Sequence, residues 1–193
     1  MIMKVLFKIR TIVAITPMLV CLLSPCSKVY ASPMVFLLGI VCFTLGLAIR
    51  IWAQQHLGYR IPKKYRKAQR KKLVTTGPYR LCRNPVYIGN ILIITGLPLM
   101  AGAPHVAPLS LVWSFLTYNI VVSKYEEPHL IEKFGPAYAA YLRNVPRWVP
   151  QPQVLKHRSG DPSPFPLWLA FKFEIHNIIW TFPFIFRYLL LKP

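Results

Sequence analysis

The chain has 193 residues, of which 54% are hydrophobic, and its formal net charge is +19. A charge of this size can indicate nucleic-acid binding, but the Lys and Arg residues lie beside long apolar stretches. Membrane topology and contact with anionic lipid explain that pattern better, so we expect a membrane protein with no nucleic-acid partner. The four cysteines show neither zinc-site nor disulfide-framework spacing, and we expect no metal.

The N-terminal stretch has the layout of a signal peptide: basic residues, an apolar run over residues 11–23, and small residues near Ser32. Cleavage and retention are both open from this pattern. We favour a retained first helix, because another apolar segment follows at once. Residues 34–53 are apolar almost throughout and form the clearest predicted membrane span.

A basic stretch follows at residues 56–83, which hold ten Lys and Arg residues and no acidic residue. Such a stretch is retained in the cytoplasm. Within it, Cys82 lies between Arg80 and Arg83, whose charges would lower the pKa of its thiol. An ordinary loop cysteine is the favoured interpretation.

Two more apolar segments, residues 86–103 and 106–123, are separated by a short turn at residues 104–105. Pro98 is expected to bend the first of them. Because the turn is so short, the two polar ends of this helical hairpin should emerge at one face of the membrane. The charge bias places that face in the cytoplasm.

The C-terminal part contains two further helical patterns. Residues 128–143 show helical spacing broken by Gly135 and Pro136. Residues 165–191 are apolar and aromatic and are expected to be broken by Pro183. A fifth membrane-embedded segment is favoured here, and a re-entrant or interfacial helix is the alternative.

Two adjacent carboxylates, Glu126 and Glu127, lie where the second helix of the hairpin ends. Like charges repel, and desolvation at a membrane surface adds to the cost. Cations placed against them, such as Arg80, Arg83 or a cationic ligand, would offset it. An equally weighted alternative is that the pair caps a following helix that has Pro128 in its first turn.

The start of the hairpin has its own chemistry. Pro85 suits the first turn of a helix and Asn84 suits its N-cap position. The backbone N–H groups of that first turn can receive an anion. Tyr79 and Tyr87 flank the turn and can face a cation.

These residues belong to two longer patterns. Residues 77–89 read G-P-Y-R-x-x-R-N-P-x-Y-x-G, and residues 126–141 read E-E-x-x-L-I-x-x-F-G-x-x-Y-x-x-Y, followed by V-P-R. Over residues 73–150 the chain resembles membrane methyltransferases of the isoprenylcysteine carboxyl methyltransferase and phospholipid N-methyltransferase group. That family usually has R-H-P-x-Y, where this chain has Asn84, which cannot titrate.

The resemblance implies an all-α, polytopic helical bundle of about four to five membrane segments with a cofactor pocket at the cytoplasmic face. It implies an enzyme that transfers a methyl group in line from S-adenosylmethionine to a lipophilic acceptor, without a Rossmann sheet. The implied catalytic residues are Arg83 and Glu127. The implied cofactor-binding residues are Tyr79, Asn84, Pro85, Tyr87, Gly89, Glu126, Glu127, Phe134, Tyr138 and Tyr141.

The chain thus divides into N-terminal membrane helices with the basic stretch (1–72), a methyltransferase core (73–150), and a linker with an aromatic membrane-associated segment (151–193). An isoprenylcysteine carboxylate, an aminophospholipid and a small lipophilic metabolite are all open as acceptors. Two other functions are retained as alternatives. One is an NADPH-dependent membrane reductase of the sterol and steroid type, and the other is a non-catalytic membrane scaffold.

Overall fold

The computed structural model describes residues 2–23, 32–57, 73–151 and 165–191. Every regular element in these residues is helical, so the expected all-α class is confirmed for this part of the chain. Most of the expected basic stretch and of the linker lies outside the described residues.

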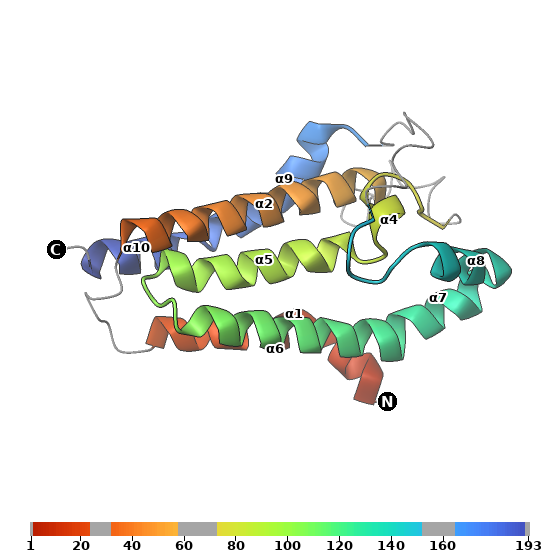
Figure 1. The fold of residues 1–193 in the computed structure, drawn as a ribbon, viewed down its shortest axis with the longest axis horizontal. Coiled ribbons are helices and arrows are strands. Elements are labelled where there is room, and N and C mark those ends of the chain that lie inside the picture. Colours follow the sequence, from red (N-terminus) through yellow and green to blue (C-terminus); the bar gives the residue numbers. More distant parts are fainter. Residues whose placement is uncertain (1, 24–31, 58–72, 152–164, 192–193) are drawn as a thin grey trace.

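The long helices run side by side along the long axis, as Figure 1 shows. They are α1 (Ile2–Leu23), α2 (Pro33–Leu57), α5 (Pro85–Met100) and α6 (Val106–Val121). Shorter elements gather at one end, and they are α4 (Pro78–Leu81), the π-helix η2 (Val122–Glu126), α7 (Glu127–Phe134) and α8 (Pro136–Asn144). The C-terminal region forms α9 (Leu167–Ile179) and α10 (Phe182–Leu191).

Two stretches of helix are long and apolar enough to cross a membrane. One is α2, and the other is the continuous helix Val106–Phe134 formed by α6, η2 and α7. The helix α5 is apolar but shorter. Large apolar side chains such as Leu109, Trp113 and Leu116 remain exposed on α6, which suits a surface that faces lipid.

The contact between α2 and α5 depends on glycine. A Cβ atom added to Gly46 would lie 2.7 Å from the carbonyl oxygen of Gly89, and the reverse distance is also 2.7 Å. Gly39 and Gly96 form a second such pair, at 2.8 Å in both directions. Small residues at these positions let the two backbones approach closely, as is common between membrane helices.

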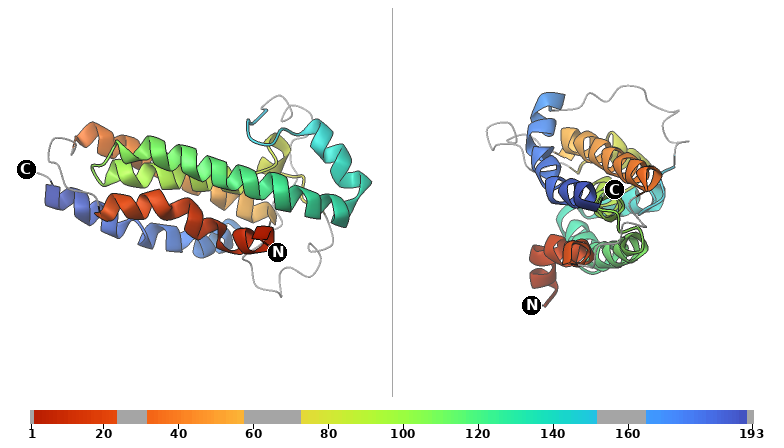
Figure 2. Two further views of the ribbon diagram at one scale, coloured as in Figure 1. Left: turned by 90° about the horizontal axis from the view of Figure 1, so that it is seen from below. Right: turned by 90° about the vertical axis from the view of Figure 1, so that its left-hand side faces the viewer.

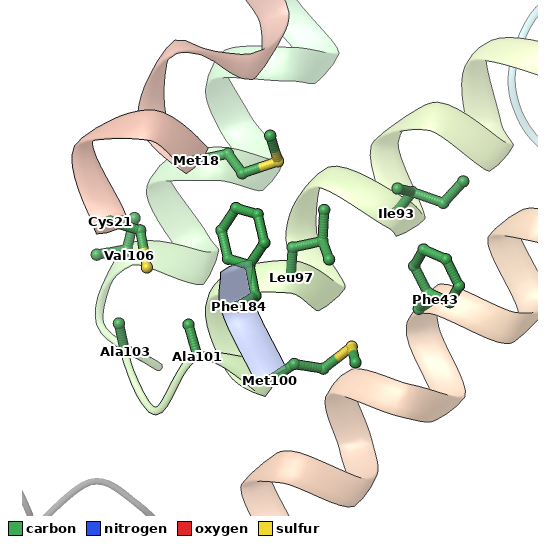
Figure 3. Close-up of a cluster of buried hydrophobic side chains, with 10 residues drawn as sticks. All are labelled: Met18, Cys21, Phe43, Ile93, Leu97, Met100, Ala101, Ala103, Val106 and Phe184. Atoms are coloured by element: carbon green, nitrogen blue, oxygen red, sulfur yellow. The ribbon is translucent and has the colours of Figure 1, made fainter. Parts of the chain in front are cut away.

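Away from α4 and α8, apolar side chains from five helices, α1, α2, α5, α6 and α10, meet in one cluster (Figure 3). Met18 of α1, Phe43 of α2, Leu97 of α5 and Phe184 of α10 all belong to it, and Phe184 is fully buried. The cluster therefore joins the C-terminal helix to the bundle, and the end-on view in Figure 2 shows α10 lying against it.

The C-terminal segment is broken next to Pro183, as expected. The α9 helix ends at Ile179, whose carbonyl Pro183 cannot bond, and α10 begins at Phe182 after a break at residues 180–181. Proline lacks an N–H group, but the first turn of a helix does not need one. Pro183 is therefore accommodated inside the first turn of α10.

Candidate functional site

A cavity of about 600 Å³ opens at the end of the bundle where α4, α7 and α8 gather. Its walls come from α1, α2, the α4–α5 region, and the η2–α7–α8 region. The short hairpin turn between α5 and α6 does bring the two polar ends to one place, as expected. The predicted site residues that line the cavity are Tyr79, Arg83, Asn84, Tyr87, Glu126, Glu127, Phe134, Tyr138 and Tyr141.

Two predicted site residues lie outside the lining. Pro85 begins α5, where its fixed φ suits the first helical turn. Gly89 faces α2, and a Cβ atom at this position would lie 2.5 Å from Cγ of Arg50. Pro85 therefore helps α5 to begin, and Gly89 lets α5 pack closely against α2.

Glu127 is 7% exposed and is held by two arginines. Its Oε1 lies 2.8 Å from Nη1 of Arg83. Arg147 donates from Nε to Oε1 at 3.1 Å and from Nη2 to Oε2 at 2.6 Å. This two-pronged geometry is the strong form of an arginine–carboxylate contact, so two guanidinium groups offset the cost of burying the carboxylate.

Glu126 has different partners. The hydroxyl of Tyr87 donates a hydrogen bond to its carboxylate. The guanidinium carbon of Arg10, from α1, lies 3.9 Å from the ring centroid of Phe7 and 5.9 Å from that of Tyr87. The two adjacent carboxylates therefore have different partners: Tyr87 bonds to Glu126, and two arginines pair with Glu127.

The π-helix η2 follows the apolar helix α6 and ends at Glu126, directly before Glu127. The backbone N–H of Glu127 donates to the carbonyl of Val122, five residues earlier, and π-turns of this kind are frequent at functional sites. Glu126 occupies the N-cap position of α7, but no side chain makes a capping hydrogen bond there. The alternative in which the glutamates merely cap a following helix is therefore wrong.

Asn84 occupies the N-cap position of α5, but its side chain makes no capping hydrogen bond. Its Nδ2 instead donates to the carbonyl of Arg147 at 3.1 Å, and the backbone N–H of Arg83 donates to the carbonyl of Pro146 at 2.9 Å. The expected capping role is wrong because the V-P-R segment provides a partner that sequence alone does not place. These two bonds fix Arg147 beside Arg83.

Tyr79 and Tyr138 remain neutral over the physiological range. Burial raises the pKa of Tyr138 to about 12 and that of Tyr79 well above its usual value. Tyr141 donates from its hydroxyl to the carbonyl of Tyr79 at 2.6 Å. Burial also raises the pKa of Cys82 to about 11, which supports the interpretation of this residue as an ordinary cysteine rather than a reactive thiolate.

Several lining residues come from outside the two sequence patterns. Among them are Phe7, Arg10 and Thr11 of α1, and Arg50, Gln54 and Leu57 of α2. Arg50 has a signal in the sequence, because it is an arginine near the end of an otherwise apolar span. The other five have none. Arg147 had a signal as well, because V-P-R belongs to the resemblance that was recognised.

Comparison with known proteins decides the family. The phospholipid methyltransferase family matches residues 34–137. The chain belongs to the phospholipid methyltransferase family. Membership confirms the resemblance seen in the sequence. Together with the two long apolar helices, it indicates that this family member is an integral membrane protein.

Curated relatives match parts of this family member. It is 30% identical over 130 residues to a cobalt-zinc-cadmium resistance protein of Cupriavidus metallidurans, covering 67% of this chain and 56% of that protein. It is 36% identical over 89 residues to the protein-S-isoprenylcysteine O-methyltransferase B of Arabidopsis thaliana, covering 45% and 44%. It is 32% identical over 89 residues to methanethiol S-methyltransferase 2 of Bradyrhizobium diazoefficiens, covering 46% and 33%.

The chain spans 56% and 52% of the lengths of two metal-resistance relatives that it matches. No solved structure matches it significantly.

Proposed function

We propose that this protein is an S-adenosylmethionine-dependent methyltransferase of the membrane that acts on a lipophilic acceptor. The observation that carries the proposal is the meeting of R-N-P-x-Y and E-E in one cavity, through the Arg83–Glu127 ion pair and the Tyr87–Glu126 hydrogen bond. Family membership and the names of two relatives support methyl transfer. They favour it over a membrane reductase or a scaffold.

The residues present fit the cofactor. Nε of Arg83 and the hydroxyl of Tyr79 are buried without a hydrogen-bond partner among the described residues, and both side chains line the cavity. A guanidinium donor suits the carboxylate of an amino acid, while a carboxylate and an aromatic face suit a sulfonium cation. When bound, S-adenosylmethionine supplies an electrophilic methyl group. Arg83, Glu126 and the ring of Tyr87 would hold its charged end.

The protein contributes mainly position and exclusion of water. Methyl transfer needs the donor and the acceptor in line, and holding two reactants in place can provide most of the rate gain. Arg147 and Arg83 hold Glu127 in one orientation from two sides. In the proposal Arg83 and Glu127 contact the reactants, and the cavity-lining Phe134, Tyr138 and Tyr141 cover them.

The proposed topology is multi-pass, with α1, α2, α5 and the α6–η2–α7 helix crossing the membrane and the α9–α10 region embedded as a fifth segment. The basic sequence between α2 and α4 supports a cavity that faces the cytoplasm, since basic segments beside apolar helices stay on that side. Residues 73–150 form the core of the proposed enzyme.

The acceptor is proposed to be lipophilic and to enter sideways between helices. The exposed apolar side chains of α6 support a lipid-facing route. Relatives named for isoprenylcysteine O-methylation and for methanethiol S-methylation extend the acceptor atoms to oxygen and sulfur. An isoprenylcysteine carboxylate is therefore the first acceptor to test, with aminophospholipids next.

The test is a titration of the purified full chain in detergent with S-adenosylhomocysteine and with NADPH. We expect micromolar binding of the first, lost in Glu127→Ala and kept in the matched variant Glu132→Ala, whose side chain is 85% exposed. Binding of NADPH alone would establish the reductase, and binding of neither would leave a scaffold. Labelled methyl donor added with a lipid extract then identifies the acceptor.

A further inference from the structure

Two buried polar groups on the α2 side of the cavity lack partners in the described part of the chain. Gln54 is 2% exposed, and its Oε1 accepts no hydrogen bond there. The hydroxyl of Tyr79, a residue that is 8% exposed, is also unpartnered there. Both side chains line the cavity. Because an unpaired buried polar atom costs free energy, these atoms indicate a place where a ligand supplies the missing partner.

The junction between α2 and the turn before α4 places both groups at the same end of the cavity. Nδ1 of His56 lies 2.9 Å from Oγ1 of Thr76. A Cβ atom on Gly77 would clash with the imidazole ring of His56, so the turn packs directly against the end of α2. His56 follows Gln54 by two residues, and Tyr79 follows Gly77 by two.

The rest of this end of the cavity is apolar or already neutralised. Leu57, Leu73 and Val74 line it. Arg50, one turn before Gln54, is paired with a buried carboxylate 2.7 Å away. A group that fits here is therefore uncharged, has apolar faces, and carries an N–H donor at its edge. The purine base of an adenosyl compound has this chemistry.

We propose that Oε1 of Gln54 accepts a hydrogen bond from the 6-amino group of the cofactor's adenine base, with the hydroxyl of Tyr79 bonded to the same ligand. This inference rests on the proposed function, which gives the amino-acid and sulfonium end of the cofactor to Arg83 and Glu126. Gln54 then selects adenine over bases that lack the 6-amino group.

The experiment compares two ligands by calorimetry on the full-length protein in detergent. One is S-adenosylhomocysteine, and the other is its analogue with hydrogen in place of the 6-amino group. Hydrogen neither donates nor accepts, so rotation of the Gln54 amide cannot rescue the analogue. The wild-type protein should bind the analogue about five- to tenfold more weakly, as expected for one lost hydrogen bond to a buried acceptor.

The ratio of the two dissociation constants is then measured in two variants. In Gln54→Leu the ratio should fall to near unity, because no acceptor remains. In Gln55→Leu, a neighbouring glutamine outside the cavity lining, the wild-type ratio should persist. The ratio is internal to each protein, so a general loss of affinity does not change it.

Three outcomes would contradict the inference, and each points to a different error. If the wild-type protein binds both ligands equally, the adenine subsite is wrong while the proposed function stands, and this comparison needs no variant to fold. If the preference survives in Gln54→Leu, another residue reads the amino group and the assignment of Gln54 is wrong. If the wild-type protein does not bind S-adenosylhomocysteine, the proposed function fails together with this inference.

Discussion

Arg50 of α2 and Glu174 of α9 form a buried ion pair, with 2.7 Å between Nη2 and Oε2. Asn177 donates a further hydrogen bond to the same carboxylate oxygen at 2.7 Å, and Arg50 also donates to Asn90 of α5. Arg50 lines the cavity. The C-terminal region, which lies beyond the family match at residues 34–137, therefore helps to position a wall of the proposed active site.

Removal of one partner of this ion pair should be worse than removal of both. Glu174→Ala leaves the guanidinium of Arg50 buried without its carboxylate, and we expect a loss of about 3–5 kcal/mol in stability. The double variant Arg50→Leu/Glu174→Leu removes both charges and should lose less. Thermal unfolding in detergent measures both, and a single variant that is no less stable than the double one would contradict the role of the pair.

Arg147 should be a stabilising partner of Glu127. Arg147→Ala removes two charge-assisted hydrogen bonds, and because the arginine side chain is 33% exposed we expect a loss of about 1–2 kcal/mol. We also expect weaker binding of S-adenosylhomocysteine, since Glu127 is then held by Arg83 alone. The exposed Arg143→Ala is the control, and equal behaviour of the two variants would refute the prediction.

The glycine contact between α2 and α5 should not tolerate a larger side chain. Gly46→Leu forces side-chain atoms against the backbone of α5, and overpacking of this kind costs about 1–3 kcal/mol. A leucine that pushes α2 away from α5 also moves Arg50, so both the ligand affinity and the melting temperature should fall. Ala48→Leu adds a leucine at an exposed position of the same helix and should leave both measurements unchanged.

Burial of Tyr138 should make the protein sensitive to alkali. Tyrosines of the unfolded chain ionise near pH 10, while Tyr138 in the folded protein keeps its proton to a pKa of about 12. Its contribution is fully present below pH 10 and is lost as the pH rises from 10 to 12, by about 1–2 kcal/mol after solvent screening. In Tyr138→Phe the fall in melting temperature over this interval should be shallower, and an unchanged slope would count against the assignment.

The sequence predicts the helices well, because long apolar runs are a strong signal of helices that can cross a membrane. The predicted span 34–53 lies within α2. The predicted hairpin of residues 86–123 matches α5 and α6, except that α5 ends at Met100, so the turn is longer than expected and covers residues 101–105. The break of the next helical pattern at Gly135 is confirmed, since this glycine has a φ of 52°, a conformation that glycine adopts most readily.

Side-chain pairing was predicted less well, because it depends on contacts between distant segments. Arg50 and Glu174 are 124 residues apart, and no local pattern links them. Asn84 has the right identity and position for an N-cap, but the carbonyl of Arg147 takes its side chain. The lining residues from α1 and α2 lie outside both recognised patterns, so only the packing of the bundle reveals them.

The π-helix η2 holds one residue more than an α-helical turn, because the N–H of Glu127 bonds to the carbonyl of Val122, five residues earlier. Deletion of one of residues 123–125 would let an α-helical turn close in its place, so Glu127 and the residues after it would keep their direction. A deletion inside α6 would act differently, because each residue of an α-helix turns it by about 100°, and Glu127 would swing away from both arginines. The π-turn is therefore a place where this helix can lose a residue without turning the carboxylates away from their partners.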